Sequence, residues 1–223
     1  MPYIYNSSAL LSASVSDNLQ PITPPVVNRY LHPWGLDLAG VSATGNQARH
    51  ITVPAILFIP LKVASTISVD RIGMMFAGAN SCVDTWTYRI GLYTHNSTDN
   101  YPSTLIADLG ALTYQPGVTP DAPQQITIAQ TLNANTTYWI AIGVTVSGGT
   151  DSAAGRTPFT YQLQGDFSMF RKRGLSSVAS AAGGIGWAHS IGSFSGTLPA
   201  SVTYATNAAS TGVCFRTPLR RSA

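Results

Sequence analysis

The sequence predicts an all-β protein: an antiparallel β-sandwich preceded by an extended N-terminal arm. The chain contains no glutamate, and lysine occurs only at Lys62 and Lys172, so it lacks two of the residues that best form surface helices. Thr, Ser, Val, Ile, Tyr, Gly and Pro take their place, which is typical of strands and turns. Between residues 84 and 146, apolar and polar residues alternate in segments separated by turn-forming residues. This pattern indicates antiparallel strands that each bury one face.

Residues 1–45 are predicted to form the arm and residues 46–223 the sandwich domain. The arm is rich in Ser and includes a proline segment at 20–25, which must be extended. It offers few periodic apolar positions, so we interpret it as an anchoring or oligomerisation arm that is held by contacts outside itself. The residues expected to make these assembly contacts are Leu19, Val26, Tyr30 and Trp34.

The predicted strands begin after His50. Apolar residues occupy both faces of segment 51–59, and Pro54 and Pro60 place that strand at an edge or a bend. Residues 63–69 lead into a core strand predicted at 71–76, which residues 77–80 end.

The central block gives the clearest alternation. One face of its strands is predicted to be dry and carries Tyr88, Ile90, Leu92, Tyr138, Ile140, Ile142 and Val144. The other face carries Arg89, Gly91, Tyr93, Trp139, Ala141 and Gly143. Residues 115–123 form a loop that prolines stiffen.

The last third of the chain is less regular. A flexible turn is expected at 148–155, short strands at 159–163 and 167–171, a Gly/Ser/Ala-rich stretch at 174–197, and closing strands at 202–204 and 213–216.

Charge is scarce, at 9% of residues against about 25% in an ordinary soluble domain. Such a surface suits contacts between subunits or with sugars. The net charge is +3, and basic residues cluster at two places, residues 171–173 and the C-terminal Arg216, Arg220 and Arg221. These clusters either contact an acidic polymer or nucleic acid, or form a solvated turn and tail that pair with Asp of a neighbouring subunit. We favour the second interpretation, because no aromatic residues are interleaved with the basic ones.

Cys82 and Cys214 lie in or beside predicted strands. They either form a disulfide across the sandwich or remain as two buried thiols. The N-terminus lacks the pattern of a secretory signal, and no run of eighteen apolar residues occurs. Synthesis in a cytoplasm without membrane insertion is therefore expected.

Catalytic and metal-binding patterns are weak. A glycosidase pair would have to come from Asp84, Asp99 and Asp108, which are more typical of turns. The four histidines have no metal-ligand spacing, and none sits in a nucleophile motif. An alternative at residues 95–100 is Ca²⁺ binding through Asn and Asp oxygens, although an Asx-rich turn explains the pattern equally well. No catalytic residue, metal or cofactor is predicted.

Aromatic residues are the remaining binding candidates, since sugars stack on exposed Trp and Tyr rings. The candidates for glycan or receptor contact are Tyr101, Trp187, Tyr114 and Trp86. The alternative is packing within the sandwich or between subunits, which we favour for Trp86 and Trp139.

One block resembles a known family. The strings R-I-G-L-Y-T at 89–94, Y-P-S-T-L-I-A-D at 101–108, I-T-I at 126–128 and L-N-A-N-T-T-Y-W-I-A-I at 132–142 resemble jelly-roll modules of tailed-phage virion proteins. Related strings occur in secreted bacterial proteins that bind carbohydrate or act in adhesion. The similarity lies within residues 84–146, and none of its positions is catalytic.

The resemblance implies a jelly-roll-like sandwich in a structural protein of the virion, made in the host cytoplasm. The expected role is a trimeric tail-fibre or baseplate-fibre component involved in attachment to the host surface. Its expected partners are further copies of itself, other virion proteins and a host-surface glycan, but not nucleic acid. The alternatives are a capsid decoration (cement) protein and a bacterial carbohydrate-binding or adhesion module.

Overall fold

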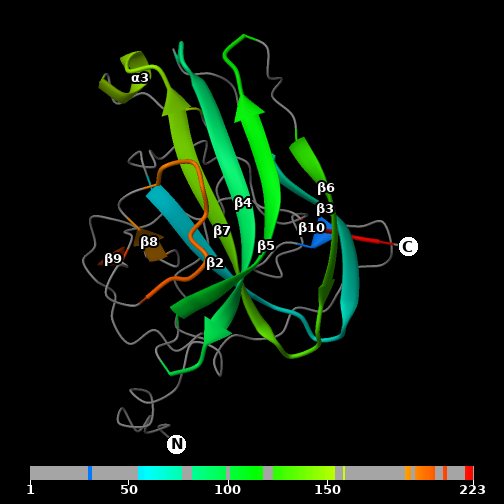
Figure 1. The fold of residues 1–223 in the computed structure, drawn as a ribbon. Helices are drawn as coiled ribbons and strands as arrows, with labels where there is room; N and C mark the ends of the chain where they lie inside the picture. The colour runs from blue at the N-terminus through cyan, green and yellow to red at the C-terminus, as the bar shows by residue number, and fades with distance from the viewer. Residues whose placement is uncertain are drawn as a thin grey trace, which may run out of the picture.

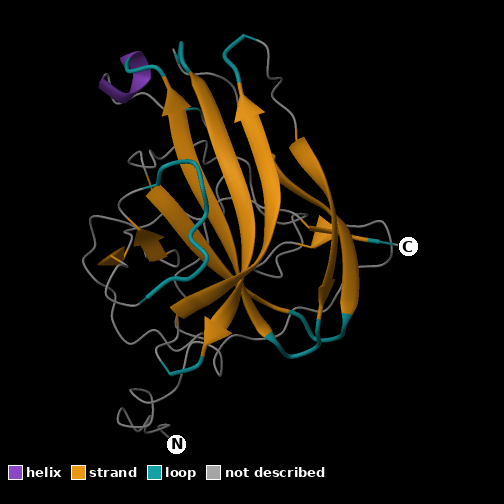
Figure 2. Ribbon diagram, viewed as in Figure 1, coloured by secondary structure: helices purple, strands orange, loops and turns teal. Residues whose placement is uncertain are grey.

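Two antiparallel sheets packed face to face make up the described part of the chain (Figure 1). The computed structural model describes residues 30–31, 55–76, 82–98, 101–117, 123–153, 158, 189–191, 194–203, 208–209 and 219–222. Among the described residues, the regular secondary structure consists of β-strands and a single helical turn, α3 (Thr150–Ala153) (Figure 2). The predicted all-β sandwich is therefore confirmed.

The smaller sheet has four strands in the order β1 (Tyr30–Leu31), β10 (Leu219–Arg221), β3 (Ile67–Met75) and β6 (Pro123–Leu132). Its two central strands come from distant parts of the sequence, because Leu219 of β10 pairs with Ile72 of β3. The tail predicted at the C-terminal arginines 220 and 221 is wrong, whereas their pairing with Asp of a neighbouring subunit stays a prediction. They belong to a strand that β1 and β3 flank, and Leu219 anchors that strand in the core with 3% of its surface exposed.

The larger sheet has six strands in the order β5 (Tyr101–Tyr114), β4 (Thr85–Asn96), β7 (Thr137–Ser147), β2 (Ala55–Lys62), β8 (His189–Ile191) and β9 (Ala208–Ala209). Strand β7 pairs with β4 along ten residues and with β2 along eight. Both faces of β7 are buried from Thr137 to Val144, as expected for a strand in the middle of a covered sheet.

The main core fills the space between the sheets. The four-stranded sheet contributes Ile67, Val69, Ile72, Met74, Leu132 and Leu219. The six-stranded sheet contributes Leu57, Ile59, Leu61, Trp86, Tyr88, Ile90, Leu92, Leu109, Leu112, Tyr114, Tyr138, Ile140, Ile142 and Val144. This is the face that alternation predicted to be dry, so the register of β4 and β7 is as expected.

Strand β2 departs from the sequence prediction. Pro54 and Pro60 suggested an edge or a bend; β2 is not an edge, because it lies between β7 and β8, and Pro54 is outside the described residues. The pairing with β8 covers only Ile56 to Phe58, so Pro60 lies beyond it, opposite Trp139 of β7. A residue without an N–H is tolerated there because only one side of the strand is paired at that point.

The closing strand predicted at 202–204 does not include Val202 and Thr203, which follow an isolated bridge between Ser201 and Thr104, and residue 204 lies outside the described residues. The predicted strands at 159–163, 167–171 and 213–216 lie outside the described residues, as does the arm apart from Tyr30 and Leu31. Cys82 carries a buried thiol that forms no disulfide, and Cys214 is not described.

Candidate binding surface

The outer face of the six-stranded sheet is half covered and half open. Residues 194–203, which we call the covering segment, lie against this face and form a second apolar cluster with it (Figure 1). The sheet contributes Ile56, Phe58, Tyr93, Leu105, Trp139 and Ala141, and the covering segment contributes Phe194, Leu198 and Val202. Sequence alternation missed this second dry face, because the residues that cover it come from a distant part of the chain, well after β7.

Two glycines make room for the covering segment. A Cβ at Gly143 would stand 2.5 Å from the ring of Phe194, and a Cβ at Gly91 would stand 2.4 Å from Leu198 Cδ1. Both distances are far below van der Waals contact. The absence of side chains at these two positions therefore lets Phe194 and Leu198 rest on the sheet itself.

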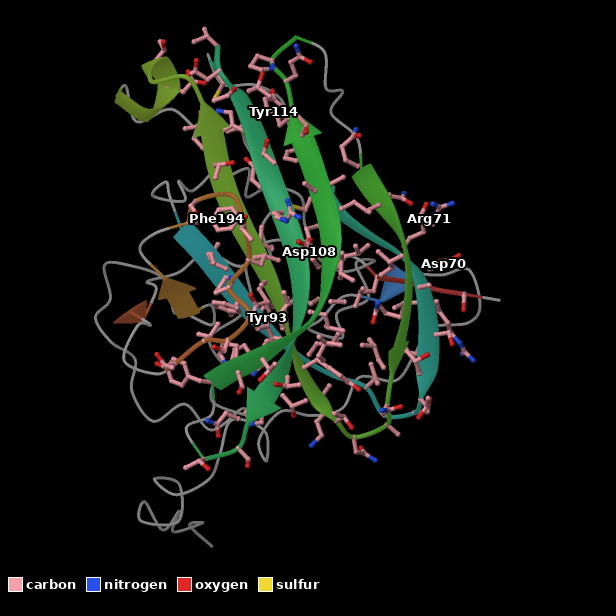
Figure 3. The ribbon with its side chains drawn as sticks, in the orientation of Figure 1. Asp70, Arg71, Tyr93, Asp108, Tyr114 and Phe194 are labelled. Atoms are coloured by element: carbon pink, nitrogen blue, oxygen red, sulfur yellow. The ribbon has the colours of Figure 1, made fainter. Side chains whose placement is uncertain are left out.

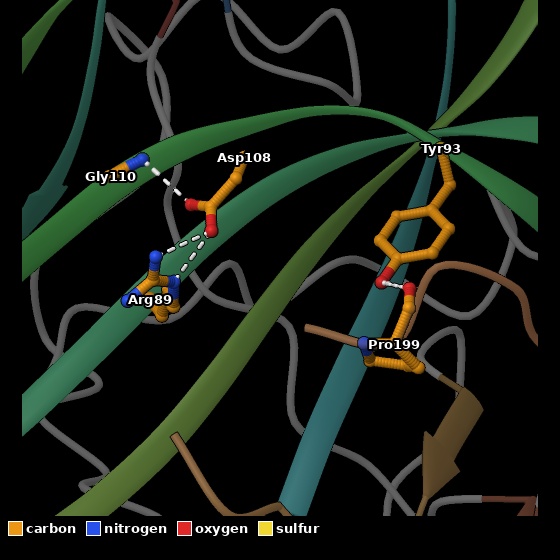
Figure 4. A network of polar contacts seen from close by, with 5 residues as sticks. All are labelled: Arg89, Tyr93, Asp108, Gly110 and Pro199. Carbon is orange, nitrogen blue, oxygen red and sulfur yellow. Dashed lines mark hydrogen bonds and ion pairs between the residues drawn. The ribbon is translucent and has the colours of Figure 1, made fainter. Parts of the chain in front are cut away.

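Hydrogen bonds fix the same segment at its other end. The Tyr93 hydroxyl donates to the Pro199 carbonyl oxygen over 2.7 Å (Figure 4). The Leu105 amide donates to the Ala200 carbonyl over 2.9 Å, and the Val202 amide donates to the Ser103 carbonyl over 2.7 Å. The segment thus satisfies backbone groups along the first part of edge strand β5.

The open half of this face is polar. Thr87 of β4 pairs with Thr113 of β5 on one side and with Thr145 of β7 on the other. Their neighbours along each strand point into the main core, so these three residues form a threonine row across the outside of the sheet.

An ion pair lies next to the threonine row. Arg89 Nη2 stands 2.6 Å from Asp108 Oδ2, and the two side chains are 38% and 30% exposed. Arg89 Nε also donates to that oxygen over 2.7 Å, while the amide of Gly110 donates to Asp108 Oδ1 over 3.1 Å (Figure 4). Each carboxylate oxygen therefore has a donor, and Gly110, at φ 108°, adopts a backbone conformation that favours glycine.

The side chains on this face can bind another molecule through hydrogen bonds. Hydroxyl groups and a guanidinium–carboxylate pair can donate and accept hydrogen bonds across a flat surface. Burial raises the pKa of the Tyr93 phenol, and the Asp108 carboxylate raises it further, so the phenol stays neutral and serves as a donor to Pro199.

The acidic residues weighed for catalysis are not brought together. Asp84 precedes β4, whereas Asp108 pairs with Gly91 seven residues further on, a separation of roughly 20 Å at strand spacing. A glycosidase pair requires about 5 to 10 Å. Asp99 is outside the described residues.

Asp151 of α3 is the acid that meets Asp84. Its carboxylate is fully buried and accepts hydrogen bonds from the amides of Val83 and Asp84 and from Trp86 Nε1. In return, the Asp151 amide donates to Asp84 Oδ2 over 2.8 Å. Both carboxylates thus hold the backbone where β7 returns beside the start of β4, which is a structural role.

Two of the four glycan candidates, Trp86 and Tyr114, are buried and so are wrong as contacts, whereas the packing that we favoured for Trp86 is confirmed. Trp86 and Tyr114 are each 1% exposed and lie opposite one another on β4 and β5. Tyr114 also packs against Phe76, with ring centroids 5.3 Å apart. The alternation of the sequence already indicated that Trp86 is buried, because Trp86 lies on the same face of its strand as Tyr88.

The other predicted contacts remain predictions. Tyr101 is half-buried at the start of β5, opposite Asn96, and Trp187 is outside the described residues. Of the predicted assembly contacts, Tyr30 is placed only by its backbone pairing with Arg220, whereas Leu19, Val26 and Trp34 are not described.

His95 has a partner that the sequence did not suggest. The indole N–H of Trp139 donates to His95 Nδ1 over 3.0 Å, and the two rings stack with centroids 6.0 Å apart. Trp139 is 1% exposed, so the imidazole satisfies a buried donor.

No group of His, Cys, Asp and Glu side chains in the described part of the chain could hold a metal ion. In the segment considered for Ca²⁺, Asn96 Oδ1 accepts a hydrogen bond from the Thr98 amide over 2.9 Å, which is an Asx turn. Within the described ranges, no helix is long and apolar enough to cross a bilayer.

The fold and this surface define a β-sandwich with an open polar face. In comparisons with family models, curated proteins and solved structures, the chain matches none.

Proposed function

We propose that the chain is a non-enzymatic structural protein of a tailed-phage virion. In this proposal it is a trimeric tail-fibre or baseplate-fibre component that takes part in attachment to the host surface. The proposal begins from the resemblance of residues 84–146 to virion jelly-roll modules and fits the all-β sandwich that these residues help to build.

The observation that carries the proposal is how the polar side chains of the sandwich are used. Asp84 and Asp151 hold backbone amides, Asp108 pairs with Arg89, and His95 accepts from Trp139. The open outer surface carries a row of three threonine hydroxyls beside an ion pair, which suit contact with sugars or with another polar protein surface. This arrangement supports a binding or assembly role over catalysis.

Localisation of the protein within particles is the primary test. Purified virions are separated into heads and tails, and each fraction is examined by mass spectrometry. We expect the protein in the tail fraction. Regular occupancy on isolated heads would instead identify a cement protein. Absence from particles, together with a monomer that binds free glycan, would identify a carbohydrate-binding module. The threonine row also suits that alternative function.

The role of the arm is tested by truncation. Deleting residues 2–28 keeps β1 and its pairing with β10, so the sandwich is expected to fold. Light scattering should give a trimer for the full chain and a monomer for the truncated chain, which should also fail to enter particles. Normal assembly and incorporation of the truncated protein would overturn the anchoring role of the arm.

A further inference from the structure

The covering segment shares its apolar cluster with Trp139 of β7. Trp139 is 1% exposed, and the segment contributes Phe194, Leu198 and Val202 to the same cluster. Figure 3 shows Phe194 of the segment and Tyr93 of β4 on this outer side of the six-stranded sheet. The indole is the largest side chain of the cluster, so the docking of the segment depends on how the sheet holds that ring.

One polar group of Trp139 is buried with the ring, and His95 of β4 satisfies it. The indole N–H donates to His95 Nδ1 over 3.0 Å. Because an indole N–H only donates, Nδ1 must keep its lone pair, so the imidazole is neutral and carries its proton on Nε2. The two ring planes are 19° apart, and the imidazole nitrogen meets the electropositive N–H edge of the indole.

Proton uptake by this imidazole conflicts with the bond. A proton on Nδ1 would face the indole N–H, so two donors would stand 3.0 Å apart without an acceptor between them. Nε2 of His95 is buried as well, so water would not solvate the cation. An ordinary imidazole takes up its proton near pH 6.5. In acid, the docked arrangement therefore opposes a proton that the same imidazole would accept in water.

Lys62 of β2 is a charged residue on the same face of the sheet, where it alternates with the core residues of its strand. It lies opposite Thr137 of β7, and Thr94 of β4 pairs with Tyr138, so the position beside His95 is Thr137. Lys62 is thus two strands from the imidazole, roughly 10 Å at strand spacing. Its positive charge adds to the cost of a second cation there.

The described carboxylates of this sheet and of α3 are engaged elsewhere. Asp108 of β5 is held by Arg89, and Asp84 and Asp151 bind each other's backbone amides at the far end of β4. The residue of β5 opposite the imidazole is Pro102, and the covering segment contains no ionisable side chain. The other titratable groups of these strands near the imidazole are Tyr93, Tyr101 and Tyr138. Phenols are neutral in acid, so none of these groups offsets the conflict.

We propose that His95 and Trp139 form an acid-sensitive latch that holds the covering segment on the sheet. At neutral pH the neutral imidazole accepts from the indole, and the segment stays docked. Below about pH 6.5, the imidazole takes up a proton when the segment is undocked but not when it is docked, so the free energy of docking falls with pH. Release of the segment uncovers the apolar face of the sheet. This latch goes beyond the proposed role in a virion and does not depend on it.

Amide hydrogen exchange of the full-length protein, followed by NMR, measures docking directly. The amides of Leu105 and Val202 form hydrogen bonds between β5 and the covering segment, so their protection reports the docked state. The amides of Ile140 and Ile142 lie in β7, which is paired on both sides, so their protection reports global unfolding. Protection factors at about pH 7.5 and about pH 5 are compared after correction for the intrinsic exchange rate.

The amides of Leu105 and Val202 should be less protected than those of β7 at both pH values, because the segment opens without global unfolding. Their protection should fall by about tenfold in acid, since opening is linked to the uptake of one proton. Protection that does not change with pH would overturn the latch. Protection equal to that of the β7 amides at both pH values would also overturn it, because the segment would then open only when the whole sandwich unfolds.

Two variants remove the conflict from opposite sides. His95→Asn places an amide oxygen near the position of Nδ1, so it still accepts from the indole but cannot titrate. The protection of Leu105 and Val202 should then stay within about twofold between the two pH values. Trp139→Phe removes the donor, so the fall in acid should shrink to about threefold or less, although the fold is less stable. A full tenfold fall in either variant would refute the role of this bond.

His189→Asn is the matched control. It removes an imidazole from β8, which pairs with β2 beside the same apolar cluster, and leaves His95 in place. The fall in protection should persist in this variant. If His189→Asn abolishes the fall and His95→Asn does not, a different histidine binds the proton and the latch is refuted. If His95→Asn fails to fold, the wild type and Trp139→Phe decide.

Discussion

The pair formed by Trp139 and His95 shows how one residue serves two purposes in this sheet. The indole ring fills the cluster beneath the covering segment, and its N–H is satisfied by a histidine at the end of the neighbouring strand. Removing the ring and removing only its N–H should therefore have different costs.

We predict that Trp139→Ala lowers the free energy of unfolding by about 3 to 5 kcal/mol, as large-to-small core substitutions do. Trp139→Phe keeps most of the apolar contact but loses the donor to His95, so about 1 to 3 kcal/mol is expected. Chemical denaturation monitored by tyrosine fluorescence checks both. A neutral effect of Trp139→Ala would show that the ring is not buried in solution.

The buried tyrosines predict instability in alkali. Burial raises the pKa of Tyr88, with further contributions from Cys82 and Tyr114, and burial together with Asp108 raises that of Tyr93. In the unfolded chain both phenols ionise near pH 10. Below that pH both phenols are neutral in the folded and the unfolded chain, so they do not make the free energy of unfolding depend on pH. Above it, the phenols ionise in the unfolded chain but stay protonated in the folded protein, which favours unfolding.

The free energy of unfolding should therefore fall above about pH 10, by up to about 1.4 kcal/mol per pH unit for each tyrosine. Denaturant titrations from about pH 8 to pH 11 measure the slope. Tyr88→Phe should reduce it, whereas Tyr101→Phe, at a half-exposed position, should change it much less. An unchanged slope in Tyr88→Phe would contradict the assignment.

At the scale of elements, the covering segment depends on two glycines of the sheet. Gly143→Ala would place a methyl group 2.5 Å from Phe194, so the ring must move. We expect a loss of about 1 to 3 kcal/mol, which is usual for overpacking. Gly149→Ala is the matched control, because a Cβ at Gly149 meets nothing within 4 Å.

A second substitution separates this explanation from a general effect of alanine. In a Gly143→Ala background, Phe194→Leu removes much of the clash and should cost less than it does in the wild type. Additive losses would show that the two positions do not contact each other. Both variants are measured by denaturant unfolding.

The return from β7 to β4 depends on Asp151. Asp151→Asn replaces a carboxylate oxygen by an NH₂ group that faces the amides of Val83 and Asp84 and the Trp86 indole. Donors then oppose donors in a buried site, so a loss of about 3 kcal/mol or more is expected. Thermal unfolding compared with Asp108→Asn, on the exposed surface, measures the difference. Similar small losses in both would refute the structural role.

At the scale of the whole molecule, the protein should show little helix. The described residues contain only the four-residue α3, and the composition lacks glutamate. Far-ultraviolet circular dichroism should give well below about a quarter helix, against roughly a third in ordinary globular proteins. A higher helix content would contradict the all-β assignment.

The sequence determined the fold class and the inner face of the sheet. Alternation is local, since successive side chains of a strand point to opposite faces, so Tyr88, Ile90, Leu92, Ile140 and Ile142 were placed correctly in the core. The same rule, applied to Trp86, would have removed it from the glycan contacts.

Only the tertiary structure decided which residues far apart in the sequence contact one another. The covering segment over Gly91 and Gly143, the bond from Trp139 to His95 and the pairing of Arg71 with Arg220 all join residues far apart in the chain. No local periodicity encodes such contacts, because they arise from strand order and register, which the packing of the whole core selects.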